Sequence, residues 1–104
     1  MDSPEVVGNR LYKIRFVAGF GAAKPPDGQQ KAFALKAGFD PKSYNQWETG
    51  KIRVPVKAAI VICKWAGNGV TLEYIYRGRL DSMGPGWALP LKEAPDRPGF
   101  VRHD

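Results

Sequence analysis

The stretch that decides the fold is residues 30–51, which read QKAFALKAGFDPKSYNQWETGK. Near its start, Phe33, Ala34 and Ala37 recur at the spacing of one helical face. They predict the inner stripe of a short helix from about residue 29 to residue 37. Gly38 is typical of the residue that ends a helix, because glycine adopts a left-handed backbone without steric cost. The first half of the stretch therefore predicts a helix followed by a sharp turn.

The second half of the stretch predicts another short helix. Asp40 is a good N-cap, Pro41 suits the first helical position, and Gly50 marks the end. Tyr44 and Trp47 lie three residues apart, so they can anchor one side in a core. The side chains left for the other faces are polar: Lys42, Ser43, Asn45, Gln46 and Thr49. The two helices and their turn predict a helix-turn-helix.

The flanking sequence predicts three more helices, over about residues 8–17, 55–66 and 72–77. In the first, Leu11, Ile14 and Val17 recur at helical spacing. The segment 19–28, which contains Pro25–Pro26, predicts a loop. No segment alternates as a strand does, so the expected fold class is all-α. We expect a compact bundle of about five short helices containing the helix-turn-helix.

The sequence after Arg79 changes in character. Prolines recur there without any apolar period, which indicates an irregular, mostly extended tail. We therefore expect a helix-turn-helix domain over residues 8–78 and a Pro-rich extended tail over residues 79–104. Trp87, Leu89 and Leu91 are the tail residues that could dock onto another surface.

The net charge of +6 is concentrated in one third of the chain. Residues 28–64 carry seven lysines and arginines against two carboxylates, and residues 65–104 carry five of each sign. Such a block is typical of a surface that binds a polyanion. The alternative is a solvated basic face without a partner, and charge alone does not separate the two.

The composition gives little support for catalysis. The chain has one cysteine, Cys63, and one histidine, His103, so neither a Ser–His–Asp nor a Cys–His set is expected. Cys63 falls in an apolar stripe and is expected to be a buried core residue. We expect no enzyme activity, no cofactor and no metal site. The N-terminal sequence lacks a secretory pattern and no apolar run is long enough for a membrane span, so a reduced, cytoplasmic protein is expected.

The sequence resembles the lambda-repressor/Cro-like helix-turn-helix family, also called XRE. The resemblance rests on QKAFALKAG at 30–38, DPKSYNQWETGK at 40–51 followed by Pro55, and VTLEYIYRG at 70–78. The run ETGK at 48–51 is the most specific piece. The resemblance covers residues 8–78, about two thirds of the chain. It implies an all-α fold whose second helix of the motif enters the major groove of DNA.

The resemblance assigns base reading to Lys42, Ser43 and Gln46. The chemistry of these side chains agrees, because glutamine pairs bidentately with adenine, lysine with guanine and serine with several bases. Asn45 either reads a base in the same way or faces solvent, and the sequence does not decide between these.

Other matching positions imply contacts with the DNA backbone and one structural pair. Gln30, Lys51 and Arg53 match residues that contact phosphates, together with the amides that open the helix after Pro55. Arg10 and Glu48 match a buried ion pair that ties the first helix to the end of the reading helix. The chain departs from the family in its long connector with Pro25–Pro26 and in Pro41, which stands where a polar residue often helps to read bases.

The implied function is sequence-specific binding of double-stranded DNA, as a transcriptional repressor or regulator of bacterial or phage type associated with the nucleoid. Such proteins usually bind as homodimers, and Tyr74 or Tyr76, with Trp87 and Leu89, could form the contact. The same aromatic residues could instead complete the core of one chain. The alternative function is an antitoxin-like or adaptor protein whose C-terminal tail binds a partner protein.

Overall fold

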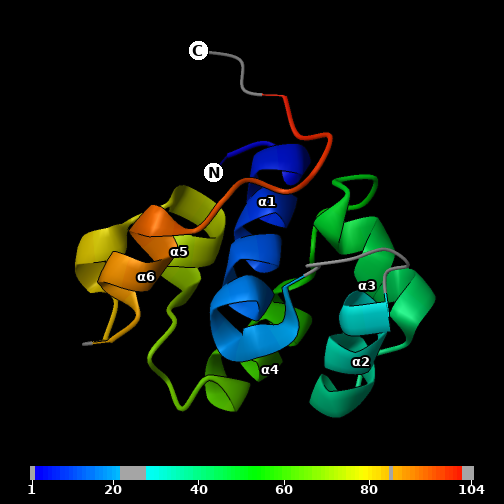
Figure 1. The fold of residues 1–104 in the computed structure, drawn as a ribbon, viewed down its shortest axis with the longest axis horizontal. Helices are drawn as coiled ribbons and strands as arrows, with labels where there is room; N and C mark the ends of the chain where they lie inside the picture. The colour runs from blue at the N-terminus through cyan, green and yellow to red at the C-terminus, as the bar shows by residue number, and fades with distance from the viewer. Residues whose placement is uncertain (1, 22–27, 85, 102–104) are drawn as a thin grey trace.

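The computed structural model describes residues 2–21, 28–84 and 86–101 and is an all-α bundle (Figure 1). Its helices, in chain order, are α1 (Pro4–Arg15), the π-helical turn η1 (Phe16–Phe20), α2 (Gly28–Ala37), α3 (Pro41–Glu48), α4 (Val56–Trp65), α5 (Leu72–Arg77), the 3₁₀ turn η2 (Leu80–Ser82) and α6 (Ala88–Glu93). The expected fold class is confirmed. None of the helices within the described ranges is long and apolar enough to cross a membrane.

Helix α1 stands at the centre of the bundle. The pair α2 and α3 lies on one side of it, and α5 and α6 lie on the other (Figure 1). Its buried residues Val7, Leu11 and Ile14 form the middle of a single core. The core also takes buried side chains from the other helices: Phe33, Ala34, Tyr44, Ala59, Ile62, Tyr74, Ile75 and Leu91. Helix α1 therefore connects the helix-turn-helix to the rest of the molecule.

The local signals that predicted α3 and α5 operate as expected. The Asp40 carboxylate accepts a hydrogen bond of 3.1 Å from the backbone N–H of Ser43, and Pro41 opens α3. In α5, the Thr71 hydroxyl accepts a 3.2 Å hydrogen bond from the N–H of Tyr74. Gly78 ends that helix in the left-handed conformation. These capping interactions are local in sequence, which is why they were predictable.

Helix α1 begins four residues before its predicted start. The Ser3 hydroxyl caps it by accepting a 3.3 Å hydrogen bond from the N–H of Val6, and Pro4 occupies the first helical position. The prediction placed Gly8 at the boundary, but Gly8 lies buried in the helix interior. The expected loop over 19–28 was wrong at its start, because Phe16–Phe20 forms η1. Pro25–Pro26 lies outside the described residues.

The tail is extended only in part. Residues 88–93 form α6, in which Leu91 is buried against the core and Leu89 is exposed. Beyond α6, residues 94–101 contain no helix, and Asn9 of α1 holds them. Its side-chain amide donates to Asp96 at 2.9 Å, and its oxygen accepts from the N–H of Arg97 at 2.6 Å. Much of the region expected to be an irregular tail therefore belongs to the fold.

Candidate nucleic-acid interface

The turn between α2 and α3 brings the two helices close together. Gly38 has a φ of +88°, which an L side chain rarely adopts. The N–H of Phe39 donates to the carbonyl of Ala34 at 2.7 Å, which closes the turn. Ala34 is fully buried. Its burial agrees with the prediction that Ala34 lies on the inner stripe of this helix, α2, and its small side chain permits a close contact.

Helix α3 separates an inner from an outer face. On the inner face, Tyr44 and Glu48 are buried and Trp47 is half-buried against the core. The Trp47 ring meets Phe39 edge to face with ring centroids 5.2 Å apart. The residues predicted to read bases lie on the outer side of the helix: Lys42 and Asn45 are exposed, and Ser43 and Gln46 are half-buried. The structure thus brings these four together on one short helix.

The Ser43 hydroxyl is less available for a contact to a base than the side chains of its neighbours. Its hydroxyl donates a 3.2 Å hydrogen bond to the same Asp40 oxygen that caps α3. A contact to a base would therefore use the hydroxyl oxygen as an acceptor, or would break this bond. Lys42, Asn45 and Gln46 form no such side-chain contact among the described residues and can extend toward a ligand.

The predicted ion pair between Arg10 and Glu48 was wrong in its cation. Arg15 forms the pair: its Nε and Nη2 each donate to a carboxylate oxygen of Glu48 at 2.8 Å. Both side chains are buried, with 3% and 1% of their surfaces exposed. Arg10 lies five residues earlier and points about 140° away around the helix. It donates instead to the carbonyl of Ile75 and to the carboxylate of Asp2.

The Arg15–Glu48 pair is the centre of a larger polar network. Gln30, predicted to contact a phosphate, donates from its side-chain amide to Glu48 at 3.1 Å. The Arg15 guanidinium also lies over the Tyr12 ring, 4.8 Å from its centroid. Burial lowers the pKa of Arg15, but the hydrogen bond and charge of Glu48 outweigh this and raise it. Burial, followed by the Glu48 charge, holds the pKa of Tyr44 well above its usual value.

The two predicted backbone contacts after α3 lie in different environments. Lys51 is exposed on the loop that follows α3, where its ammonium group could contact a phosphate. Arg53 is half-buried, and its Nη1 donates to the backbone carbonyl of Asp2. The guanidinium has further N–H groups, so this bond does not exhaust its donors. Pro55 caps the helix that follows, α4, without a side-chain hydrogen bond, which leaves its first amides free of a side-chain cap.

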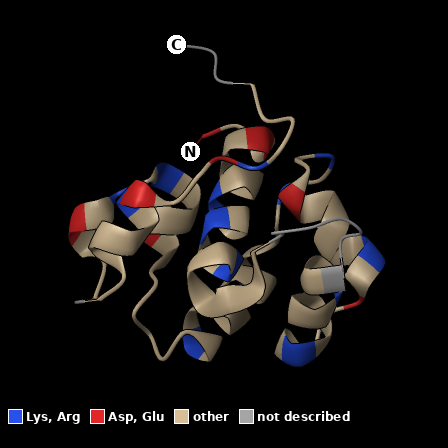
Figure 2. Cartoon of the chain, in the orientation of Figure 1, with Lys and Arg blue, Asp and Glu red and all other residues tan. Residues whose placement is uncertain are grey.

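The surface of residues 28–64 is more basic than the composition indicates. Its two carboxylates are Asp40, which caps α3, and Glu48, which is buried and neutralised by Arg15. Of these two, only Asp40 is exposed to solvent. The exposed lysines of this region are Lys31, Lys36, Lys42, Lys51, Lys57 and Lys64. Figure 2 shows blue segments on α2, near the start of α3 and on the loop that follows α3.

Two residues that position α3 were not predicted from the sequence. Arg15 carries a usable signal, because it follows Leu11 by four residues on the apolar stripe of α1. A cation on such a stripe requires a buried partner. Gly8 carries no comparable signal, because its role is set by another helix. A Cβ atom on Gly8 would lie 2.3 Å from the backbone oxygen of Glu48, so α1 and α3 cross there in backbone contact.

Comparisons of the chain with protein-family models, with curated proteins and with solved structures give no match.

Proposed function

We propose that this chain binds double-stranded DNA and reads its sequence with α3 in the major groove, as a transcriptional regulator of the lambda-repressor/Cro-like kind. One observation carries the proposal. Helix α3 is anchored by Tyr44 and by the buried Arg15–Glu48 pair, while Lys42, Asn45 and Gln46 face outward from it. A reading helix needs this division between a fixed inner face and a polar outer face.

The charges around α3 support the same proposal. Exposed lysines lie on α2, at the start of α3 and at position 51, and the one exposed carboxylate of the region is occupied as a helix cap. Cations in this arrangement would neutralise phosphates on both sides of the groove and release condensed counterions. They would supply affinity for any sequence, whereas the outer face of α3 would supply selection among sequences.

The test of this function is the salt dependence of binding to a fluorescent duplex of random sequence. For the wild-type chain, we expect the logarithm of the affinity to fall linearly with the logarithm of the salt concentration. Lys51→Ala should reduce the slope by about one. The matched control is Lys92→Ala, which removes an exposed lysine on α6, across α1 from the helix-turn-helix. A slope near zero for wild type, or equal changes in both variants, would count against this interface.

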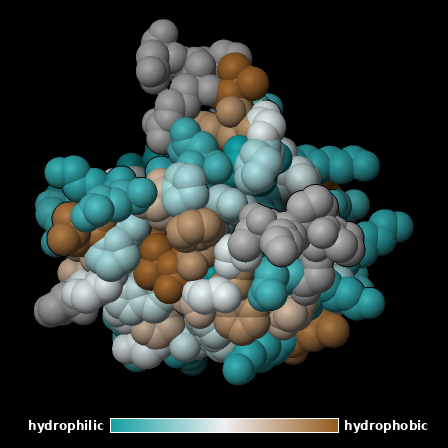
Figure 3. Space-filling model, viewed as in Figure 1, coloured by the Kyte–Doolittle hydropathy of each residue, from teal (hydrophilic) through white to brown (hydrophobic). Residues whose placement is uncertain are grey.

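A homodimer remains part of the proposal, because a single small module buries less surface than tight regulators need. The expected contact through Tyr74 and Tyr76 was wrong, since both are buried in the core of one chain, 3% and 6% exposed. Of the residues suggested in the tail, Leu89 is 64% exposed and is available for a second chain. The view in Figure 3 shows apolar surface as separate patches among polar side chains.

The adaptor alternative now depends on Leu89, which is exposed, and on Trp87, which is half-buried and packs against Gly69. Leu91 is buried, so a partner protein could engage it only after α6 left the core. No observation favours this alternative over DNA binding.

A further inference from the structure

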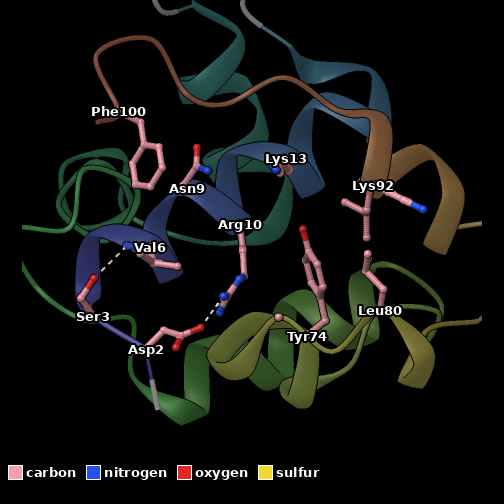
Figure 4. Close-up of a pocket in the computed structure, with 12 residues that line it drawn as sticks. Asp2, Ser3, Val6, Asn9, Arg10, Lys13, Tyr74, Leu80, Lys92 and Phe100 are labelled. Atoms are coloured by element: carbon pink, nitrogen blue, oxygen red, sulfur yellow. Dashed lines mark hydrogen bonds and ion pairs between the residues drawn. The ribbon is translucent and has the colours of Figure 1, made fainter. Parts of the chain in front are cut away.

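A second candidate site lies on the opposite side of α1 from the helix-turn-helix. A cavity of about 410 Å³ opens between α1, α5, α6 and the segment that follows α6. This volume lies within the usual range for small-molecule sites, about 300–1,000 Å³. Figure 4 shows its lining side chains converging from these separate elements.

Tyr74 is the unusual residue of this cavity. Its side chain is 3% exposed, yet within the described part of the chain its hydroxyl has no hydrogen-bond partner. Figure 4 shows this hydroxyl directed into the open space beside Arg10. The buried Tyr76 differs, because its hydroxyl donates to the carbonyl of Val54 at 2.7 Å. The one buried side-chain atom that lacks a partner in the described part of the chain is Arg97 Nε, so the Tyr74 hydroxyl reaches the open space of the cavity and is available to a ligand there.

Two cations of α1 line the cavity together with Tyr74. Arg10 and Lys13 are three residues apart on one face of the helix and both line the cavity. Each already contacts a partly exposed carboxylate: Arg10 contacts Asp2, and Lys13 lies 3.4 Å from Asp96. The lysine ammonium has three donors and the guanidinium five, so both retain donors for another anion. The Tyr74 hydroxyl is a third donor, because it is protonated at neutral pH as any tyrosine is, and burial raises its pKa further, to about 12.

The rest of the lining is mixed. Val6, Leu80, Leu91 and Phe100 give it apolar walls, and Asp2, Ser3 and Asn9 add polar groups. Lys92 stands at the rim, and its side chain extends away from the cavity in Figure 4. A fully hydrated inorganic anion would leave these apolar walls uncovered. A ligand with a small charged group and a hydrocarbon body would satisfy both parts of the lining.

We propose that this cavity binds a small organic carboxylate. The carboxylate accepts hydrogen bonds from the Tyr74 hydroxyl and from Lys13 or Arg10, and the hydrocarbon body packs on Leu80 and Leu91. The proposal is independent of DNA binding, because none of these groups belongs to α2, α3 or the loop after them. It gives the chain a ligand site within the same small fold as the helix-turn-helix.

The test is a titration of the isotope-labelled full chain, followed by amide resonances. The probes are hexanoate and 3-phenylpropionate, with hexanamide as the neutral match and inorganic phosphate as the anion without a body. We expect a carboxylate to shift the amides of Lys13, Tyr74 and Leu91 at concentrations of about 1–10 mM or below. Hexanamide and phosphate should bind at least about tenfold more weakly.

Two variants identify the groups that hold the carboxylate. Tyr74→Phe should weaken carboxylate binding about tenfold, because it removes one charge-assisted hydrogen bond. It should leave the melting temperature nearly unchanged, because the hydroxyl has no partner to lose. Lys13→Met should weaken binding similarly, and Lys64→Met, on the exposed side of α4, should not. The proposal is overturned if neither carboxylate binds, if hexanamide or phosphate binds equally well, or if Tyr74→Phe and Lys13→Met bind as wild type does.

Discussion

At the scale of single residues, the buried pair of Arg15 and Glu48 determines how α3, the proposed reading helix, is held. Two parallel hydrogen bonds of 2.8 Å join α1 to the last turn of α3. Taking both charges out of water is costly, and the bidentate geometry, with Gln30 as a further donor, offsets that cost. The position of α3 therefore depends on both partners being present.

We predict that Glu48→Ala lowers the free energy of unfolding by about 3–5 kcal/mol, because it leaves the Arg15 charge buried without its partner. Urea denaturation followed by circular dichroism measures the loss. The comparison is Arg10→Ala, which removes a pair with the 43% exposed Asp2 and a hydrogen bond to the carbonyl of Ile75, and should cost less than Glu48→Ala. A greater loss in Arg10→Ala than in Glu48→Ala would contradict the assignment of the pair.

The buried tyrosines predict a loss of stability in alkali. The pKa of Tyr74 in the folded chain is about 12, above the unfolded value of 10.0. Above pH 10 the unfolded state loses this proton first, so the free energy of unfolding falls as the pH rises to about 12. The Tyr74 contribution should fall by about 1.4 kcal/mol per pH unit in this window.

Tyr74→Phe isolates that contribution. Because phenylalanine does not ionise, the variant should lose stability less steeply than wild type between about pH 10 and pH 12. Urea unfolding of both proteins at a series of pH values gives the two slopes. Parallel slopes would show that Tyr74 ionises in the folded chain as readily as in the unfolded chain.

At the scale of the helices, what the sequence predicted and what it missed have different physical origins. Helix α3 was predictable because Asp40, Pro41 and Gly50 set its ends through contacts within a few residues. Once that helix was predicted, its periodicity was enough to predict that Lys42, Asn45 and Gln46 face outward. Local signals of this kind do not depend on the rest of the fold.

The missed features depend on contacts between distant parts of the chain. The position of Arg15 on the apolar stripe of α1 indicates a buried partner but does not name it, and the crossing of α1 over α3 is what places Glu48 beside it. The prediction began the helix at about residue 8, whereas Gly8 lies inside α1 and lets that crossing occur. Helix α6 was missed because Pro90 within it and the prolines on either side argue for a loop, whereas burial of Leu91 against the core stabilises the helix.

The α1–α3 crossing makes a prediction for Gly8→Ala. In a helix interior this change ordinarily adds about 1 kcal/mol of stability. Here the new Cβ would lie 2.3 Å from the oxygen of Glu48 and 2.5 Å from that of Trp47, both backbone atoms. We expect a net loss of about 1–3 kcal/mol, as for overpacking of a tight interface.

Thermal and urea unfolding of Gly8→Ala measure that change. The reverse substitution Ala32→Gly, at an exposed position of α2, reports the effect of helix propensity without a crossing. It should cost about 1 kcal/mol. If Gly8→Ala were stabilising, α1 and α3 would not be in backbone contact.

At the scale of the whole molecule, helix α1 separates two surfaces with different chemistry. On one side lie the basic helix-turn-helix and the loop with Lys51, and on the other lies the cavity with Tyr74 on its wall (Figures 1 and 4). The C-terminal segment, held by Asn9, closes part of the second side. One small core thus supports a proposed DNA-reading face and a proposed ligand site.

The proposed dimer makes a prediction at this scale. On DNA we expect two chains with their α3 helices about 34 Å apart in successive major grooves. Footprinting, together with light scattering of the complex, measures the protected length and the number of chains. Leu89→Ser, at the exposed position on α6, should weaken assembly if this face forms the contact. One chain per duplex with protection of roughly four to six base pairs would contradict the dimer.

The central claim is that α3 selects the DNA sequence, and the most direct test is a ratio of two affinities. Duplexes enriched from a randomised pool by the wild-type chain are compared with a scrambled duplex, for wild type and for Gln46→Ala. We predict that Gln46→Ala loses about 1–3 kcal/mol of affinity for the enriched duplex and little for the scrambled one, so that the ratio falls by about tenfold or more. Failure of the wild-type chain to enrich any sequence, or an equal loss on both duplexes, would contradict the claim.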